Sequence, residues 1–237
     1  MQIEIAIPIL NEESTLDAQI RLVDRFLIES LTAYPETSVI IADNGSTDQS
    51  SEIGQALAKE LDRVSYERVG QRGVGRALKH TWTRSMADVV GYMDLDLSTD
   101  LSHLPEALRM IEQGSDVVTG SRLSPGSKVI GRSPVRSVVS HAFNLIVRTY
   151  FGTHFADGMC GFKFLLREHV APLIDLGAKS DGWFFATEIL ICAEYAGLRV
   201  DDLPVIWRDD PETKARMGKL TIEYLTAMRR LKRQLQS

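Results

Sequence analysis

Two aspartates stand two positions apart in the run YMDLDLS at residues 92–98. The run is apolar enough for a strand, in which successive side chains point to opposite faces. One face of such a strand would carry Tyr92, Asp94, Asp96 and Ser98. Neighbouring carboxylates repel each other unless a cation lies between them, and Mg²⁺ and Mn²⁺ prefer oxygen ligands. The spacing therefore predicts that Asp94 and Asp96 bind Mg²⁺ or Mn²⁺; the alternative is that Asp94 caps a loop and Asp96 is solvated.

The elements that must position these carboxylates alternate in kind along residues 1–120. Helical patterns separate the β-rich runs, which lie at 3–9, 38–43, 63–69, 89–95 and 116–121. Strands that are separated by helices indicate parallel pairing through right-handed crossovers. The pattern predicts an α/β fold with a doubly wound, mostly parallel sheet flanked by helices.

Polar side chains follow four of these predicted strands at the point where each strand ends. They are Asn11 with Glu12, Asp43, the run 94–98, and Ser121 with Arg122. In doubly wound sheets, ligands bind beyond the carboxyl ends of the strands. These residues are therefore expected to converge on one binding site.

The composition is that of an ordinary globular protein, with 237 residues of which 44% are hydrophobic and 25% are charged. A net charge of -5 gives no reason to expect nucleic acid as a partner. No apolar run approaches the ~18 residues of a membrane span, and MQIEIAIPIL is typical of a strand rather than a signal peptide. Two distant cysteines, Cys160 and Cys192, match no metal-site spacing, so a reducing cytoplasmic setting is expected.

The second half of the chain differs in charge and pattern. Residues 117–156 contain no Asp or Glu but several Arg, Lys and His residues, and a second basic run, RRLKR, lies at 229–233. Such a stretch either faces an anionic partner, such as a membrane surface, or is a solvated face balanced by acids from elsewhere. Residues 137–151 predict a mostly apolar helix. An amphipathic C-terminal helix is predicted from the stripe Leu220, Tyr224, Met228, Leu231 and Leu235.

The segments IPILNEE, IIADNGSTD, GVGRALKH, MDLDLS, GSR and DGMCGFKF occur in this order at plausible spacing. Together they resemble the family 2 glycosyltransferases, which have the GT-A nucleotide-sugar fold, and within them the polyprenyl-phosphate hexose synthases of the dolichyl-phosphate glucosyltransferase and mannose synthase type. The resemblance covers nearly the whole chain. It implies one glycosyltransferase domain over 1–237, with a nucleotide-sugar-binding half at 1–123 and an acceptor-binding half at 124–237.

The resemblance also implies roles for individual residues. Those matching the nucleotide-binding positions are Pro8, Asn11, Glu12, Asp43, Gly73, Arg76 and Asp94. Those matching catalytic and acceptor positions are Asp96, Arg122, Asp157, Lys163, Glu188, Arg208 and Lys214. The sequence departs from the family pattern at Ala186. Relatives often carry an aspartate at this position, two residues before the glutamate that corresponds to Glu188.

The implied reaction moves a hexose, with inversion, from a nucleotide sugar to an acceptor. The donor is expected to be UDP-glucose, or else GDP-mannose, with its leaving diphosphate neutralised by the metal and Arg122. A polyprenyl-phosphate acceptor is already anionic and needs only cations such as Lys163, Arg208 or Lys214 to position it. A hydroxyl acceptor would need a general base, for which Asp157 and Glu188 are candidates.

Other classes of protein carry related motifs. A phosphatase of the haloacid-dehalogenase type also has D-x-D-x-[ST] after a strand, although there the motif usually opens the fold. A nucleotide-sugar-binding protein that has lost turnover is a further alternative, and Ala186 would be its sign. The turn GVGRAL lacks the third glycine of the dinucleotide fingerprint, which argues against an NAD enzyme.

Overall fold

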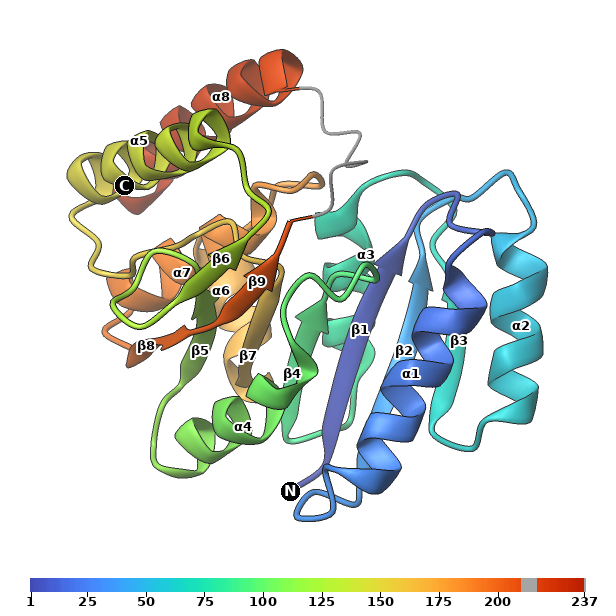
Figure 1. The fold of residues 1–237 in the computed structure, drawn as a ribbon. Helices are drawn as coiled ribbons and strands as arrows, with labels where there is room; N and C mark the ends of the chain where they lie inside the picture. The colour runs from blue at the N-terminus through green and yellow to red at the C-terminus, as the bar shows by residue number, and fades with distance from the viewer. Residues whose placement is uncertain (210–216, 237) are drawn as a thin grey trace.

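The structure, a computed structural model, describes the backbone of residues 1–209 and 217–236 and the side chains of 1–209 and 223–236. Its centre is a seven-stranded sheet of order β3-β2-β1-β4-β7-β5-β8 (Figure 1). The strands of this sheet are β1 (Ile3–Ile9), β2 (Thr37–Asp43), β3 (Val64–Arg68), β4 (Val89–Met93), β5 (Val117–Ser121), β7 (Phe162–Leu166) and β8 (Val200–Pro204). A second sheet pairs β6 (Lys128–Ile130) with β9 (Ile206–Arg208).

All neighbouring strands of the large sheet run parallel except at β7, which is antiparallel to both β4 and β5. The predicted α/β class and the mostly parallel sheet are confirmed. The pattern at 1–120 correctly indicated five of the strands, but no strand was predicted after residue 121. Strands β7 and β8 come from that later part, so both halves of the chain build one sheet.

The helices divide between two hydrophobic cores. The helices of the first core are α1 (Leu16–Glu29), α2 (Ser50–Glu60) and α4 (Leu104–Glu112). Those of the second are α3 (Val74–Arg84), α5 (Pro134–Phe151), α6 (Val170–Leu176), α7 (Phe185–Tyr195) and α8 (Met217–Leu235). Short 3₁₀ turns, η1 (Leu101–His103) and η2 (Arg167–His169), lead into α4 and α6. The predicted C-terminal helix is therefore present.

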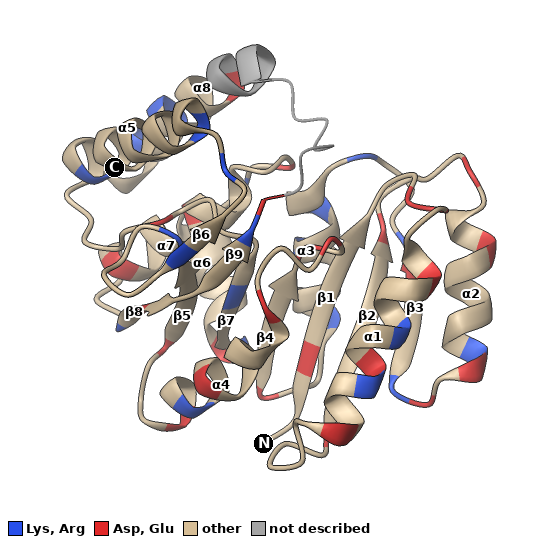
Figure 2. Cartoon of the chain, in the orientation of Figure 1, with Lys and Arg blue, Asp and Glu red and all other residues tan. Residues whose placement is uncertain are grey.

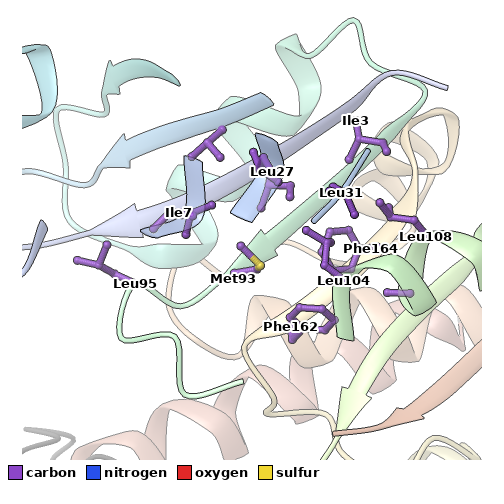
Figure 3. Packing of buried hydrophobic residues seen from close by; sticks show 14 of the residues in the cluster. Ile3, Ile7, Leu27, Leu31, Met93, Leu95, Leu104, Leu108, Phe162 and Phe164 are labelled. Carbon is purple, nitrogen blue, oxygen red and sulfur yellow. The ribbon is translucent and has the colours of Figure 1, made fainter. Parts of the chain in front are cut away.

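The cores lie on opposite faces of the sheet because strand side chains alternate. In β1, Ile5 and Ile7 enter the first core and Ala6 the second. Met93 of β4 and Phe162 of β7 meet the leucines of α1 and α4 in the first core (Figure 3). Tyr92, next to Met93, is fully buried in the second core, and the polar site begins just beyond this strand end.

Strand β4 is shorter than the strand predicted at 89–95, so the single strand face expected to carry Tyr92, Asp94, Asp96 and Ser98 is not formed. Strand β4 ends at Met93, and Leu97 has a left-handed backbone with φ of 49°. The Ser98 N–H donates to Asp96 Oδ1 at 2.9 Å, a side-chain turn that competes with strand pairing. Asp94 and Asp96 are therefore brought near each other by a tight turn rather than by alternation along a strand.

Among the helices within the described residues, none is long and apolar enough to cross a membrane.

Candidate active site

The two aspartates of the turn differ in exposure. Asp96 is exposed, whereas Asp94 is partly covered and its N–H donates to the Gly161 carbonyl at 3.1 Å. Burial, and then the charge of Asp96, raise the pKa of Asp94 to about 7. The turn thus concentrates negative charge that the nearby Lys163 and Arg122 offset only in part.

This donor set fits a hard divalent cation. Two carboxylates close enough to disturb each other are the oxygen ligands that Mg²⁺ and Mn²⁺ take. In the part of the chain that the structure describes, no group of three or more His, Cys, Asp or Glu residues could hold a metal by itself. A cation at Asp94 and Asp96 would therefore draw its other ligands from substrate phosphate and water, as Mg²⁺ commonly does.

Arg122, directly after β5, forms a buried ion pair with Asp157. Its Nε and Nη2 donate to the two carboxylate oxygens at 2.6 and 2.9 Å, and the side chains are 8% and 0% exposed. Burial opposes both charges, yet Arg122 holds the pKa of Asp157 below its ordinary value, and Asp157 raises the pKa of Arg122. The guanidinium also stacks on Trp207 of β9, with 4.8 Å to the ring centroid. Asp157 is thus an ionised, enclosed partner of Arg122, and nothing in this geometry suits it to remove a proton from an acceptor.

Lys163 lies beneath the turn in β7, with no exposed surface. Its Nζ donates to the Cys160 carbonyl at 2.5 Å and lies 5.9 Å from the Tyr92 ring centroid. Burial lowers the pKa of Lys163, and the neighbouring carboxylates Asp157 and Asp94 oppose this effect. The structure therefore places Lys163 below the site, where it contributes positive charge without reaching an acceptor on the surface.

More arginines gather beside Arg122. Burial, and then the charge of Arg122, lower the pKa of Arg132, to which Arg136 also contributes. Arg132 donates to Ser140 Oγ at 2.6 Å while its Nε is buried without a partner among the described atoms. Arg136 donates to Asp209 at 2.7 Å. Three arginines thus lie close together, of which Arg122 and Arg136 are paired with carboxylates, while the buried Nε of Arg132 is a donor without a partner among the described atoms.

Strand β9 joins this arginine cluster to the aspartate turn. The N–H of Arg208 donates to the Ser98 carbonyl at 2.8 Å, and Trp207 pairs with Thr99 in an isolated bridge. The Arg208 side chain is exposed. The structure thus brings Arg208 of β9 next to the aspartate turn, while its role toward an acceptor stays a prediction and Lys214 lies outside the described residues.

The ends of β1 and β2, which carry residues predicted to bind the nucleotide, are tied together. Asp43 is fully buried and accepts from the N–H groups of Gly45 and Ser46 at 3.0 and 2.7 Å, and from the Tyr66 hydroxyl at 2.7 Å. Asn11, with a left-handed φ of 58°, accepts from the Thr47 N–H at 2.8 Å. The Asp43 carboxylate is therefore occupied in shaping this turn.

Two further predicted nucleotide positions lie near these strand ends. Pro8 is half-buried in β1, opposite Ala42 of β2. The N–H of Glu12 donates to Ser50 Oγ at 2.8 Å, which ties the end of β1 to the start of α2.

The glycine-rich turn before α3 packs against the loop that precedes α7. A side chain at Gly73 would overlap the Asp181 carbonyl, and its φ of 148° already disfavours one. A side chain at Gly75 would overlap Phe185 and the Ser180 carbonyl. Arg76 forms an ion pair with Asp181 at 2.6 Å. These glycines are thus explained by close packing of chain on chain, and their place under a nucleotide stays a prediction.

Glu188 lies in α7 and has no exposed surface. It accepts from the Ser180 N–H at 2.7 Å and the Ser180 hydroxyl at 2.8 Å, and it pairs with Arg230 of α8. Burial raises the pKa of Glu188. Ala186, two positions earlier, is 4% exposed within the second core. Glu188 thus anchors α8 to the loop before α7 rather than facing the aspartate turn.

The sequence analysis overlooked two residues that the structure brings to this site. Trp207 supports Arg122 and carries a buried indole N–H without a partner among the described atoms. Arg132 was noted only as part of an acid-free stretch. The sequence signal for both was weak, because each depends on the pairing of β6 with β9 across a long sequence separation.

Residues 4–171 match the family described as "Glycosyl transferase family 2", and the chain belongs to this family. It is a glycosyltransferase domain, which confirms the resemblance seen in the motifs and argues against the phosphatase alternative.

Within this family, the chain is similar to several curated glycosyltransferases. The chain is 35% identical to glycosyltransferase AglD of Haloferax volcanii over 90% of its own length and 34% of that protein. It is 25% identical to dolichyl-phosphate beta-glucosyltransferase of Saccharomyces cerevisiae, with 87% and 67% of the two chains covered. It is 27% identical to dolichol-phosphate mannosyltransferase of Pyrococcus furiosus, with 98% and 64% covered. The chain thus spans between about a third and two thirds of these relatives.

Solved structures share the fold. The glucosyl-3-phosphoglycerate synthase of Mycobacterium tuberculosis, in complex with Mn²⁺, UDP and phosphoglyceric acid, matches with a TM-score of 0.67 and 18% identity over 99% of this chain and 78% of that one. The same enzyme in complex with Mn²⁺, UDP and glucosyl-3-phosphoglycerate gives a TM-score of 0.64 at 19% identity over 99% and 78% of the two chains. The expected GT-A-type fold is confirmed.

Proposed function

We propose that this domain transfers a hexose from a nucleotide sugar to a polyprenyl phosphate, with a divalent cation held by Asp94 and Asp96. UDP-glucose is the preferred donor and GDP-mannose the second choice. Support comes from the relatives that act on dolichyl phosphate and from the structural neighbours that bind UDP with Mn²⁺. When bound, the cation would supply positive charge for the diphosphate that leaves the sugar.

The choice of a phosphate acceptor rests on one observation, which is the state of the two candidate bases. Asp157 is enclosed by Arg122, and Glu188 is enclosed by Ser180 and Arg230. A hydroxyl acceptor needs a base within hydrogen-bond reach of its proton. A phosphate monoester is already an anion and needs none, and the adjacent arginine cluster matches its charge.

In this proposal, the chain's own residues mainly position charges. Arg122 is held between Asp157 and Trp207, so its place is set before substrate arrives. Arg132, Arg136 and Arg208 bind the acceptor phosphate on the side of β9. The acceptor oxygen then attacks the sugar opposite the leaving diphosphate, and the configuration inverts.

A lipid acceptor requires contact with a membrane, and α5 has the face for it. Its exposed side chains include Val135 (72%), Val138 (67%), Leu145 (54%) and Ile146 (50%), whereas the buried ones are the polar Ser140 and Asn144 together with Val147. A surface helix normally shows the reverse arrangement. Figure 2 shows basic residues, which are Arg136 and Arg148, on α5 and no Asp or Glu. We propose that α5 lies on the membrane surface, with its apolar face inserted and basic residues near anionic headgroups.

The deciding experiment is a donor screen with a short polyprenyl phosphate, read by mass spectrometry. UDP-glucose and GDP-mannose are offered with Mg²⁺ or Mn²⁺, and 3-phosphoglycerate and the unphosphorylated polyprenol serve as competing acceptor arms. The proposal predicts a hexosyl phosphodiester product from the lipid phosphate alone. Transfer to the polyprenol or to 3-phosphoglycerate would overturn the acceptor assignment, and nucleotide-sugar binding without any transfer would favour a non-catalytic binding protein.

A further inference from the structure

We propose that Gly161 is a positioning residue for Asp94, because its missing side chain leaves the space that the Asp94 carboxylate occupies. A Cβ atom at Gly161 would overlap the carboxylate oxygens of Asp94. Gly161 is not among the residues with positive φ, so its backbone does not itself require glycine. Space for the carboxylate is therefore the requirement at this position.

The closeness follows from the sheet. In the antiparallel pair of β4 and β7, Met93 stands opposite Phe162, so the next pair outward is Asp94 and Gly161. The Asp94 N–H donates to the Gly161 carbonyl at 3.1 Å and continues the ladder by one bond. The antiparallel insertion of β7 thus brings the acceptor-side loop directly against the metal motif.

The backbone at Gly161 cannot easily shift away from Asp94, because the contacts of Cys160 hold it in place. The preceding Cys160 carbonyl accepts from Lys163 Nζ at 2.5 Å and faces the Tyr92 hydroxyl at 3.5 Å. The Cys160 thiol is buried against Thr99 Oγ1 at 3.8 Å. A side chain added at Gly161 would therefore displace the Asp94 carboxylate rather than the loop.

The same short segment also holds the acceptor side. Asp157, four positions before Gly161, fixes Arg122. The segment 157–161 consequently sets the distance between the carboxylate assigned to the metal and the arginine assigned to phosphate. This reading rests on the proposed function for its catalytic consequence, but the contact between Gly161 and Asp94 does not.

The first test measures Mn²⁺ binding by electron paramagnetic resonance in the absence of donor. Gly161→Ala should weaken binding by about tenfold or more, the size typical of changes next to metal ligands. Gly91→Ala is the matched control, because its side chain would overlap Phe164 in the same strand pair, away from any carboxylate. Wild-type Mn²⁺ affinity in Gly161→Ala would overturn the proposal, as would an equal loss in both variants.

The second test is a double-mutant cycle on thermal stability without metal or substrate. Gly161→Ala should lower Tm by several degrees in the native background and by less than half as much in Asp94→Ala, which lacks the carboxylate. If Gly161→Ala alone does not fold, the double variant should recover a folded protein. An equal Tm loss in both backgrounds, or a double variant that stays unfolded, would overturn the contact itself. If the double-mutant cycle gives the expected smaller Tm loss in Asp94→Ala but the wild type binds no Mn²⁺, the result would instead count against the proposed function.

Discussion

Arg122 and Asp157 act as one unit in this structure, because each is buried and each is charged. Breaking such a pair costs far more than the pair itself contributes, since one charge is left without a partner in a poorly solvated place. The pair therefore stabilises a particular arrangement of the site rather than the fold in general. Its value lies in presenting Arg122 in one orientation against Trp207.

Asp157→Asn should lower stability at neutral pH by about 3–5 kcal/mol, as loss of one partner of a buried ion pair does. The pKa of Asp157 is depressed in the folded state. Its contribution is therefore full above the ordinary aspartate pKa of about 3.9 and is lost as pH falls through the lower folded-state value. Urea unfolding between neutral pH and acid should show the gap between wild type and variant narrowing below about pH 4.

Asp17→Asn supplies the control for this measurement, because Asp17 pairs with Arg21 on the exposed surface of α1. It should change stability by less than about 1 kcal/mol. A gap between wild type and Asp157→Asn that is independent of pH would contradict the ionised state assigned to Asp157.

Asp96→Ala should abolish transfer, because the cation would lose an exposed ligand while the fold keeps its cores. EDTA should do the same to the wild type, and added Mn²⁺ should restore it. Asp100→Ala is a suitable control, since Asp100 lies four positions after Asp96 and caps η1 by accepting from the Ser102 N–H. Full activity of the wild type in excess EDTA would exclude metal dependence.

For single residues, the sequence predicted a position in the fold where that position depends only on the nearby strand pattern. Asp43, Asp94 and Arg122 could be placed at strand ends because parallel strands end at the same edge. The partner of Arg122 could not be predicted, because Asp157 lies 35 positions away and reaches it only through the β7 insertion. Burial of Lys163 was equally hidden, since a lysine in GFKF is by itself more typical of a surface.

Among the elements, α5 shows how an apolar helix can be predicted while its orientation is not. The run SVVSHAFNLIVRTYF has apolar residues around most of its circumference, so periodicity does not choose the buried face. In the structure, the side of α5 that carries Ser140 and Asn144 is buried. Asn144 Oδ1 accepts from the Gly158 N–H at 2.8 Å. This hydrogen bond to the loop before β7 holds Asn144 inward, and the apolar side of α5 with Val135, Val138, Leu145 and Ile146 faces outward.

Val138→Ser with Ile146→Ser should reduce sedimentation with liposomes by several-fold, because two apolar side chains would no longer enter the lipid. The paired control is Leu22→Ser with Ile28→Ser on α1, whose side chains are 49% and 56% exposed. That variant should bind like the wild type. Equal losses in both variants would mean that α5 is not the membrane-facing element.

Glu188→Gln should weaken the attachment of α8 and leave the chemical step nearly unchanged. The Gln side chain keeps the shape but removes the charge that faces Arg230. Limited proteolysis should cut the C-terminal helix faster, while kcat should fall much less than the ~10²–10⁴-fold expected for loss of a general base. A collapse of kcat together with loss of the acidic limb of the pH profile would make Glu188 the base of a hydroxyl acceptor reaction.

Acidic and basic residues are unevenly distributed along the whole molecule. The chain carries -5 overall, yet residues 117–156 contain no acid. Such a division orients a protein at an anionic surface, with the acidic remainder turned away. The long-range electrostatic field of the protein therefore favours the same membrane-facing surface as the apolar side of α5.

Binding to vesicles that contain anionic lipid should weaken as salt rises from about 0.1 M to about 1 M, because the screening length falls from about 10 Å to about 3 Å. Lys128→Ser with Arg148→Ser should lower binding at low salt and flatten this dependence. Arg25→Ser with Lys59→Ser, on the remote α1 and α2, should change neither. Equal binding to neutral and anionic vesicles at low salt would exclude the electrostatic part of the attraction.

The overall fold was predictable to the extent that sequence neighbours are also sheet neighbours. The crossovers among β1, β2, β3 and β4 follow from alternating strands and helices. The place of β7 between β4 and β5 does not, because an antiparallel strand arriving from residue 162 leaves no periodic signal of its destination. The split into halves at residue 123 stays a prediction, although the sheet itself draws strands from both sides of it.

The late arrival of β7 also matters for how the chain is made. On the ribosome, β1, β4 and β5 emerge before the strand that must separate β4 from β5 has been synthesised. Until Phe162–Leu166 leaves the exit tunnel, the edges of β4 and β5 are open, and direct pairing between them is a competing misfolded state. The site at Asp94 is finished only when Gly161 meets it, so the same step closes the gap between β4 and β5 and completes the surroundings of Asp94, before β8 is added to the sheet.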